Sequence, residues 1–404
     1  MAVIHTDEQG KFAILDEQIF YADVYKNLGV TVDPSLYDIH NPYMMDSAFE
    51  AWQSNGGEKR QGKKRKHEEN EAQEEGLNEL YVHVKAVYGK IQEAGRAVGH
   101  FYDVTERDNN QKARQLAKKI LSEFPKLYNP EAMPSTQIVS LKHKRVFVAE
   151  SELSILNSWF ANEEEEAVEI LLRASSSAHH SDQPDLSIYL PPNSTFHIGN
   201  ATDTRQFCSI NDCTFDLIVA DPPWYNRSVQ RNETYEMDQT ILKSLSMEML
   251  SEWGILAMWI SNATGLMPRV EKHLNRWNLH VIATWAWLKV TREGDPVCEF
   301  KSHHKLPYEI LLLCSRIEYQ SIPSRFIFAS VPMGLHSRKP PLLDLFKSMG
   351  FNPKNTLELF ARSLLPCTTS VGFEPLLCQS DLCFVKHVRQ PEDNNGALVF
   401  ENKR

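Results

Sequence analysis

The chain of 404 residues has few cysteines and no long apolar run. Its seven cysteines are scattered and include no Cys-x-x-Cys pair, so their spacing indicates neither a disulfide framework nor a zinc site. The paired histidines at 303 and 304 have no third ligand at a metal-binding spacing, and we expect no metal. No apolar run reaches the ~18 residues of a membrane-spanning helix, and the first twenty residues do not resemble a secretory signal. We therefore expect a soluble intracellular protein without a membrane partner.

Positive charge is also scarce when the chain is taken as a whole. The net charge is -10, but residues 190–390 hold 20 Lys+Arg and 19 Asp+Glu, so the acidic excess lies outside this part. Total charge argues weakly against nucleic-acid binding, whereas a balanced C-terminal half leaves room for a local basic groove.

Low-complexity composition marks one segment near the N-terminus. Residues 54–76 are polar and highly charged, which is the composition of a disordered linker after an N-terminal segment at 1–53. The run KRQGKKRK at Lys59–Lys66 within it is of the nuclear-localisation kind. We therefore expect the protein in the nucleus, and in the cytoplasm as well.

Helical periodicity follows the linker. Apolar residues recur at steps of three and four from Leu80 to Ala94, and the stretches NNQKARQLAKKILSEF and ANEEEEAVEILLRA repeat that period. This pattern predicts a mainly helical domain at 77–185 with an acidic outer face.

Short apolar runs alternate with helical patterns from residue 186 onward. The predicted strands are Phe215–Ala220, Ile255–Ile260, Val281–Leu288, Tyr308–Cys314, Phe326–Val331 and Thr356–Phe360, and the predicted helices cover 234–253, 262–277 and 339–350. This alternation predicts an α/β domain with a largely parallel sheet at 186–390, followed by a tail at 391–404. In such sheets ligands bind at the C-terminal ends of the strands.

The tetrapeptide Asp221-Pro222-Pro223-Trp224 follows one of these strands directly. Two prolines cannot continue a buried strand, so Asp221 stands at its C-terminal end. A carboxylate and a backbone carbonyl that accept the two N–H protons of an exocyclic base amine favour the nucleophilic geometry of that nitrogen. Asp221 and the rigidly aimed carbonyl of Pro222 suit this task, and Trp224 is a candidate to stack on an extruded base. A rigid turn with an exposed acid is the plainer alternative.

Basic and aromatic residues interleave in the loop after this motif. Arg227 and Arg231 lie near Tyr225 and Tyr235, a combination that suits a phosphate backbone with unstacked bases. Tyr225 is a second candidate to stack on the base. A mixed surface loop without such a role is the alternative.

Six separated pieces resemble the eukaryotic adenine-N6 methyltransferases that carry an Asp-Pro-Pro-Trp motif. They stand in that family's order, as LPPNSTF at 190–196, DPPWYNRSVQR at 221–231, WAWLKV at 285–290, HKLPYE at 304–309, SVPMGLHSRKPPL at 330–342 and LELFAR at 357–362. The resemblance covers most of the C-terminal domain and only faintly the N-terminal half. It implies a Rossmann-like methyltransferase domain, S-adenosyl-L-methionine as methyl donor and transfer to N6 of adenine in nucleic acid.

The same resemblance implies roles for individual residues. The implied catalytic residues are Asp221, Pro222, Pro223 and Trp224. The implied cofactor contacts are Asn200, Ala201, Asp221, Lys339, Glu358, Arg362, Phe373 and Glu374. The implied substrate contacts are Tyr225, Arg227, Arg231, Tyr235, His304, Lys305, Glu309 and His336.

Two positions depart from the family's pattern. Asn200 stands where the family usually has Asp, which keeps a hydrogen-bond acceptor but removes a charge. Val371-Gly372-Phe373 stands where the family usually has a Trp-Gly-Asn stretch that closes over the cofactor. Phe373 cannot make the hydrogen bonds of an amide, so we expect Glu374 to supply them, the cofactor to bind more weakly, or the loop to be arranged differently.

The resemblance leaves several substrates open. It implies RNA first, as N6-methylation of 2′-O-methyladenosine in spliceosomal U2 small nuclear RNA by an enzyme active as a monomer. DNA adenine is the alternative, because family members have also been connected with DNA. A second alternative function is a non-catalytic RNA-binding scaffold of the same fold. A third is methylation of a protein side-chain amide, because related Asn-Pro-Pro-Tyr motifs serve that reaction in other methyltransferases.

Overall fold

A computed structural model describes residues 2–44, 75–105, 107–128, 133–143, 146–148, 158–173, 186–224, 242–262, 266–300, 306–335 and 338–386. Its strands are β1 Val3–Thr6, β2 Phe12–Leu15, β3 Val30–Val32, β4 Ile138–Ser140, β5 Val146–Val148, β6 Trp159–Asn162, β7 Val168–Arg173, β8 Leu186–Leu190, β9 Ser194–Ile198, β10 Phe215–Ala220, β11 Leu250–Ile260, β12 His280–Lys289, β13 Tyr308–Ser315, β14 Arg325–Ser330, β15 Thr356–Leu359, β16 Thr368–Gly372 and β17 Phe384–Lys386. Its α-helices are α1 Glu17–Val24, α3 Glu75–Ala97, α4 Gln111–Glu123, α5 Asp203–Asn211, α7 Leu266–Arg276 and α8 Leu343–Ser348. The 3₁₀ helices are η1 Lys26–Leu28, η2 Pro34–Tyr37, η5 Leu377–Gln379 and η6 Asp381–Cys383. In these ranges no helix has both the length and the apolar character to cross a membrane.

Twelve of the described strands form one mixed sheet. Their order is β1-β2-β14-β12-β13-β11-β10-β15-β16-β9-β6-β4. Strand β10 is parallel to both of its neighbours, β11 and β15, and β16 and β9 continue the parallel set. Strand β13 is antiparallel to β11 and to β12, so β12 runs in the same direction as β10. The C-terminal ends of β9, β10, β11, β12, β15 and β16 therefore share one edge.

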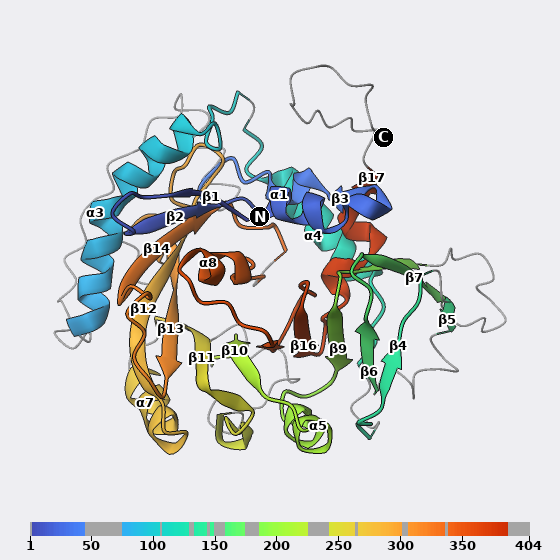
Figure 1. Cartoon of the computed structure of the whole chain (residues 1–404). Helices are drawn as coiled ribbons and strands as arrows, with labels where there is room; N and C mark the ends of the chain where they lie inside the picture. Colours follow the sequence, from blue (N-terminus) through green and yellow to red (C-terminus); the bar gives the residue numbers. More distant parts are fainter. Residues whose placement is uncertain are drawn as a thin grey trace.

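Apolar side chains cover both faces of the sheet because its central strands are almost continuously apolar. Leu217 and the tryptophans Trp285 and Trp287 pack on one face with Leu345 and Phe346 of α8. The other face packs against α7, α3 and α1 through the remaining core residues. Figure 1 shows the sheet curving around α8, with α3 and α7 on the outer side.

The six strands predicted between residues 215 and 360 are confirmed. Each one overlaps a strand of the structure, and β10 has the predicted bounds. The predicted helix at 262–277 is confirmed as α7, and the one at 339–350 contains the shorter α8. The predicted helix at 234–253 is wrong at its end, because residues 250–253 begin strand β11, where Leu250 pairs with Phe215. Residues 234–241 of that prediction lie outside the described residues.

The prediction of a mainly helical region at 77–185 is correct for its first half only. Helices α3 and α4 occur where the periodicity places them, but ANEEEEAVEILLRA is not a helix. It contains the end of β6, an acidic turn and strand β7. Val168, Ile170 and Leu172 are buried and alternate along β7, and this two-residue period is that of a strand and not of a helix. The Asn162 amide fixes the turn by donating to the Glu166 carbonyl (3.0 Å) and accepting from the Glu164 N–H (3.1 Å).

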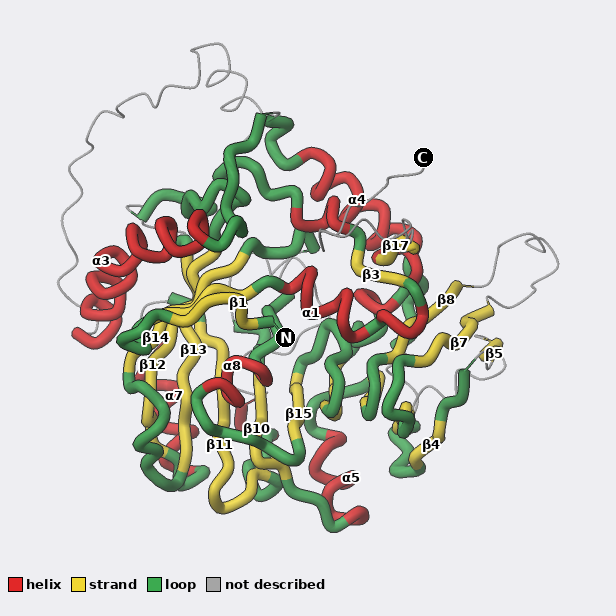
Figure 2. The backbone as a smooth tube through the Cα atoms, turned by 45° about the horizontal axis from the view of Figure 1, so that its top comes forward, coloured by secondary structure: helices red, strands yellow, loops and turns green. Residues whose placement is uncertain are grey.

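Segments from the N-terminal half complete the large sheet. Strand β2 pairs with β14 at one side, and β6 pairs with β9 at the other. Figure 2 shows α3 crossing the sheet near β14 and β12, and α4 beside α1 and β3. The region that precedes residue 186 therefore contributes both strands and helices to the architecture around the site. Of the linker predicted at 54–76, residues 54–74 with the basic run at Lys59–Lys66 lie outside the described residues, and residues 75 and 76 begin helix α3 instead.

Candidate active site

The C-terminal end of β10 carries the Asp221 motif. Asp221 follows Ala220 directly, and its backbone N–H donates to the Leu359 carbonyl of β15 (3.4 Å). The next strand along the chain, β11, lies on one side of β10, and the much later β15 lies on the other. Such a change of direction in strand order opens a crevice at the strand ends, and ligands of α/β sheets bind there.

The ammonium group of Lys339 connects two carboxylates at this edge. Its Nζ lies 3.1 Å from Oδ2 of Asp221 and 2.7 Å from Oε2 of Glu309. A second lysine, Lys289 at the end of β12, pairs with Oε1 of Glu309. Lys339 also lies over the Trp259 ring, 5.3 Å from its centroid. Four charged side chains from four separate strands or loops thus meet beside the motif.

The charges in this cluster shift the pKa values of its members. Burial raises the pKa of Glu309, but the ammonium groups of Lys339 and Lys289 outweigh burial and bring the pKa down to about 2. Burial lowers the pKa of Lys339, and the carboxylates of Asp221 and Glu309 outweigh it, so that the pKa of Lys339 is raised. Glu309 is therefore ionised and Lys339 protonated throughout the physiological range.

Trp224 anchors the motif to the sheet. Its side chain is only 7% exposed, and its Nε1 donates to the Trp259 carbonyl at the end of β11 (2.7 Å). Pro222 and Pro223 are buried beside it. These contacts fix the loop that carries Asp221. Stacking of Trp224 on a base stays a prediction.

The predicted cofactor contacts gather along the ends of β9, β15 and β16. Asn200 is exposed, and its Oδ1 accepts from the Thr202 N–H (3.1 Å) in a turn that precedes α5, whereas Ala201 is buried. Arg362 is half-buried after β15. The structure thus places these residues on the same edge as Asp221 and Lys339.

Glu358 shows that this edge suits a polar cofactor. Its Oε2 is buried without a hydrogen-bond partner among the described residues. Burial raises its pKa to about 7, and the Asp221 carboxylate adds to the rise while Arg338 and Lys339 oppose it. A buried acceptor without a donor is unfavourable, and the hydroxyl groups of a ribose would supply donors. The residues present therefore fit S-adenosylmethionine.

Phe373 packs against a second aromatic residue. Its ring centroid lies 4.3 Å from that of Tyr128, a residue that follows α4. Gly372 just before it is closely packed, because a Cβ there would lie 2.3 Å from the Ala361 carbonyl oxygen. Glu374, the alternative source of hydrogen bonds, is exposed. The loop therefore contains an aromatic pair, and the three expectations for cofactor binding at Phe373 stay predictions.

Seven predicted substrate contacts are in segments that the structure does not describe. They are Tyr225, Arg227, Arg231, Tyr235, His304, Lys305 and His336. Of the predicted substrate contacts only Glu309 is described, and it belongs to the charge cluster around Lys339.

Comparisons with known proteins now decide the family. A model of the MT-A70 family matches residues 215–374. A Caenorhabditis elegans protein named DNA N6-methyl methyltransferase is 36% identical over 384 residues, which is 94% of this chain and 99% of that protein. The chain belongs to the MT-A70 family of adenine-N6 methyltransferases. The donor that MT-A70 methyltransferases use is S-adenosylmethionine.

Further MT-A70 relatives match a shorter part of the chain. Human N(6)-adenine-specific methyltransferase METTL4 is 34% identical over 206 residues, 47% of this chain and 43% of that protein. The Cryphonectria parasitica N6-methyladenosine RNA methyltransferase MTA1 is 34% identical over 209 residues, 48% of this chain and 62% of that protein. The predicted resemblance is confirmed at the level of the family.

Sequence reasoning missed two charged residues that support the MT-A70 site. Lys289 pairs with Glu309. The stretch WAWLKV places Lys289 at the end of a strand, which was the available signal for this residue. Arg338 precedes Lys339 and is buried, with Nη1 donating to Tyr37 Oη (3.3 Å). Tyr37 lies three hundred residues earlier, so no local pattern indicates this contact.

Proposed function

We propose that this MT-A70 protein transfers a methyl group from S-adenosylmethionine to N6 of adenine in DNA. The observation that carries the proposal is the Lys339 ion pair with Asp221 at the C-terminal end of β10, directly before two buried prolines. DNA is preferred as substrate because the relative that this chain covers almost completely is named a DNA N6-methyl methyltransferase.

The chain's own residues have three tasks in this reaction. Lys339 engages Oδ2 of Asp221, which leaves Oδ1 to accept one N–H of the adenine amine, and in the proposed geometry the Pro222 carbonyl accepts the other. Both acceptors favour a nitrogen lone pair that points at the methyl donor and stabilise the positive charge that develops there. S-adenosylmethionine supplies an already activated methyl group, so orientation accounts for much of the rate.

The electron and proton balance follows from this arrangement. The N6 lone pair forms the new N–C bond while the methyl–sulfur bond breaks, and its electrons stay on sulfur in the neutral thioether product. The amine then loses one proton, for which Asp221 is the nearest acceptor in the proposed geometry. Glu309, ionised with a pKa of about 2, holds Lys339 in place throughout.

RNA is the second candidate substrate. The fungal MTA1 relatives are named N6-methyladenosine RNA methyltransferases, and 2′-O-methyladenosine of U2 small nuclear RNA is the specific site proposed on this reading. A 2′-O-methyl group distinguishes the two candidates, because DNA has no 2′-oxygen.

The test is labelled-methyl transfer to matched oligonucleotides. DNA, RNA, and RNA with one 2′-O-methyl group on the target adenosine would share one sequence and be compared by kcat/KM. The proposal expects DNA to be the best substrate of the three. A preference for the 2′-O-methylated RNA would favour small nuclear RNA over DNA as the substrate. If the protein binds S-adenosylhomocysteine in a separate titration but transfers methyl to none of the oligonucleotides, the result would support a non-catalytic scaffold.

A further inference from the structure

Tyr43 is an exposed aromatic residue at the edge of the sheet that carries the site. It is 49% exposed, whereas Trp224 of the motif is buried and has its indole N–H engaged by Trp259. Tyr43 therefore offers an aromatic side chain with solvent-exposed surface in addition to the predicted stacking residue Trp224. Tyr43 lies in the N-terminal segment, far outside the residues that the family model matches.

A chain of contacts leads from Tyr43 to the charge cluster. The Tyr43 N–H donates to the Val297 carbonyl (2.7 Å), and the Val297 N–H donates to the Lys289 carbonyl (3.1 Å). Lys289 pairs with Glu309, which pairs with Lys339 and thus connects to Asp221. Because β12 runs in the same direction as β10, the loop after Lys289 lies on the side of the sheet where Asp221 stands.

Charge supports the same placement. Although half of Tyr43 is exposed, burial of the rest of its side chain raises the pKa of the phenol, and the Cys298 thiol and then the Glu309 carboxylate add to that rise. The phenol therefore lies within electrostatic reach of the charge cluster and stays neutral. A neutral aromatic ring can stack on a nucleobase, and it does not repel the phosphate groups that flank that base.

The segment that ends in Tyr43 is rigidly mounted. Asn110 Oδ1 accepts from the backbone N–H groups of His40 (2.8 Å) and Asn41 (2.9 Å), and its Nδ2 donates back to the Asn41 carbonyl (2.9 Å). The Arg292 N–H donates to the Ile39 carbonyl (2.8 Å). Residues 39–43 are thereby attached at both ends, to the segment before α4 and to the loop after β12.

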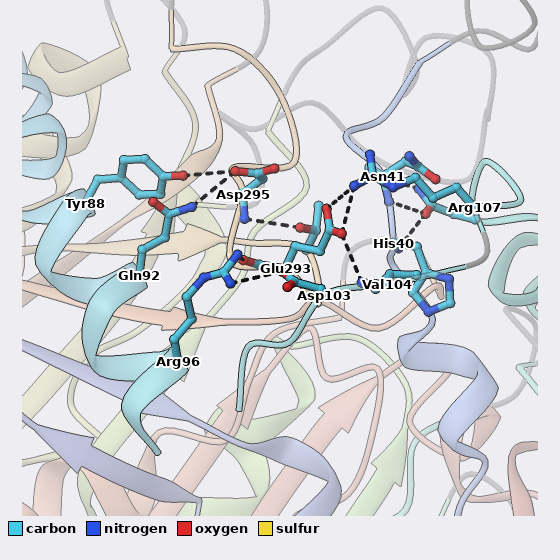
Figure 3. A network of polar contacts seen from close by, with 12 residues as sticks. His40, Asn41, Tyr88, Gln92, Arg96, Asp103, Val104, Arg107, Glu293 and Asp295 are labelled. Atoms are coloured by element: carbon cyan, nitrogen blue, oxygen red, sulfur yellow. Dashed lines mark hydrogen bonds and ion pairs between the residues drawn. The ribbon is translucent and has the colours of Figure 1, made fainter. Parts of the chain in front are cut away.

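The loop after β12 is held just as firmly, as Figure 3 shows. Glu293 accepts two contacts from Arg107 (2.6 and 2.8 Å) and one from the Val104 N–H (3.0 Å). Asp295 accepts from Tyr88 Oη (3.4 Å) and Gln92 Nε2 (3.2 Å) of α3. Two N-terminal segments, residues 104–107 and α3, therefore fix the loop to which the Tyr43 backbone is bound, so little entropy is lost when a base stacks there.

We propose that Tyr43 is a stacking platform for a nucleobase of the nucleic-acid substrate. The proposal rests on the proposed function, because it assigns a new contact to the substrate of the same site. Tyr43 is open to solvent, and its backbone is fixed at the edge of the sheet where Asp221 stands.

The test compares Tyr43→Ala with Tyr43→Phe, which keeps the ring. Base–aromatic stacking contributes roughly 1–3 kcal/mol, so Tyr43→Ala should raise the oligonucleotide Kd about 5- to 150-fold, while Tyr43→Phe stays within about twofold of wild type. The affinity for S-adenosylhomocysteine should not change in either variant. With 2-aminopurine at successive positions around the target, wild type and Tyr43→Phe should quench its fluorescence at one position, and Tyr43→Ala should not.

Trp253→Ala is the matched control. Trp253 is 65% exposed at the start of β11, at the edge opposite to Asp221, and its removal should leave the oligonucleotide Kd unchanged. Two results would overturn the stacking role alone if wild type is active. One is an oligonucleotide Kd that Tyr43→Ala leaves unchanged, and the other is an equal rise in that Kd for Tyr43→Ala and Tyr43→Phe. A wild type that methylates no oligonucleotide would overturn the proposed function and this inference with it.

Discussion

Replacing Lys339 by Met tests the charge cluster that holds Asp221. The substitution keeps the apolar stem and removes the ammonium group that contacts Asp221 at 3.1 Å and Glu309 at 2.7 Å. Two carboxylates then lose their shared cation, and Asp221 is no longer held toward the adenine amine. We expect slower methyl transfer with the fold kept.

The magnitude follows from the contacts. A hydrogen bond to a charged group contributes about 1.5–3 kcal/mol, and because the Lys339 and Asp221 side chains are 11% and 19% exposed, the lower part of that range applies. A loss of roughly 1.5–2 kcal/mol corresponds to a kcat/KM lower by about 10- to 30-fold. The assay is initial-rate transfer of labelled methyl to an adenine oligonucleotide at saturating S-adenosylmethionine.

Lys347→Met provides the control for this experiment. Lys347 is exposed at the end of α8, so its removal should leave kcat/KM unchanged. Lys339→Met should also bring the pKa of Glu309 back from about 2 toward 4.5. The stability that the lowered pKa contributes to wild type is present above pH 4.5 and lost as the pH falls toward 2, so the unfolding free energy of the variant should lie below that of wild type at neutral pH and the difference should shrink on acidification. A kcat/KM within threefold of wild type would refute the role given to Lys339.

Three further predictions concern other parts of the chain. Burial raises the pKa of Glu17 to about 7, so wild type should lose up to about 3 kcal/mol of unfolding free energy relative to Glu17→Gln as the pH rises from 4.5 to 8. Denaturant titrations of both proteins at the two pH values measure this difference, and an equal change in wild type and Glu17→Gln would contradict it. Trp224→Phe removes the hydrogen bond to Trp259 and should lower the unfolding free energy by about 1–3 kcal/mol, seen as a lower midpoint in urea. Deleting Lys63–Lys66 from a fluorescent fusion should move it to the cytoplasm, and an unchanged distribution would remove the targeting role.

Local sequence signals predict the central sheet well. The strand at Phe215–Ala220 is apolar except for Asp216 and ends at an acid followed by two prolines, so both its burial and its C-terminal end are visible in the sequence. The same holds for the run before Lys289 in β12. These strands are buried on both faces, and such strands are the ones that composition identifies best.

Long-range pairing explains what the sequence does not predict. Val168–Arg173 is a strand because it pairs with β8. The same sequence also fits a helical period when the pairing strand is unknown. Tyr128 meets Phe373 and Tyr37 meets Arg338 only after folding brings distant segments together. The sequence therefore identifies the motif residues of the site but not the N-terminal residues that support it.

Methyl transfer by Asp221→Ala is the most direct test of the central claim. The account assigns to this carboxylate the acceptance of an adenine N–H, and Asp221→Asn, of nearly the same shape, is the companion variant. Both variants should keep the circular dichroism spectrum and melting temperature of wild type. We then predict no transfer of labelled methyl to an adenine oligonucleotide above background for Asp221→Ala, and a large loss of kcat/KM for Asp221→Asn. Transfer by Asp221→Ala at a rate near wild type would contradict the account.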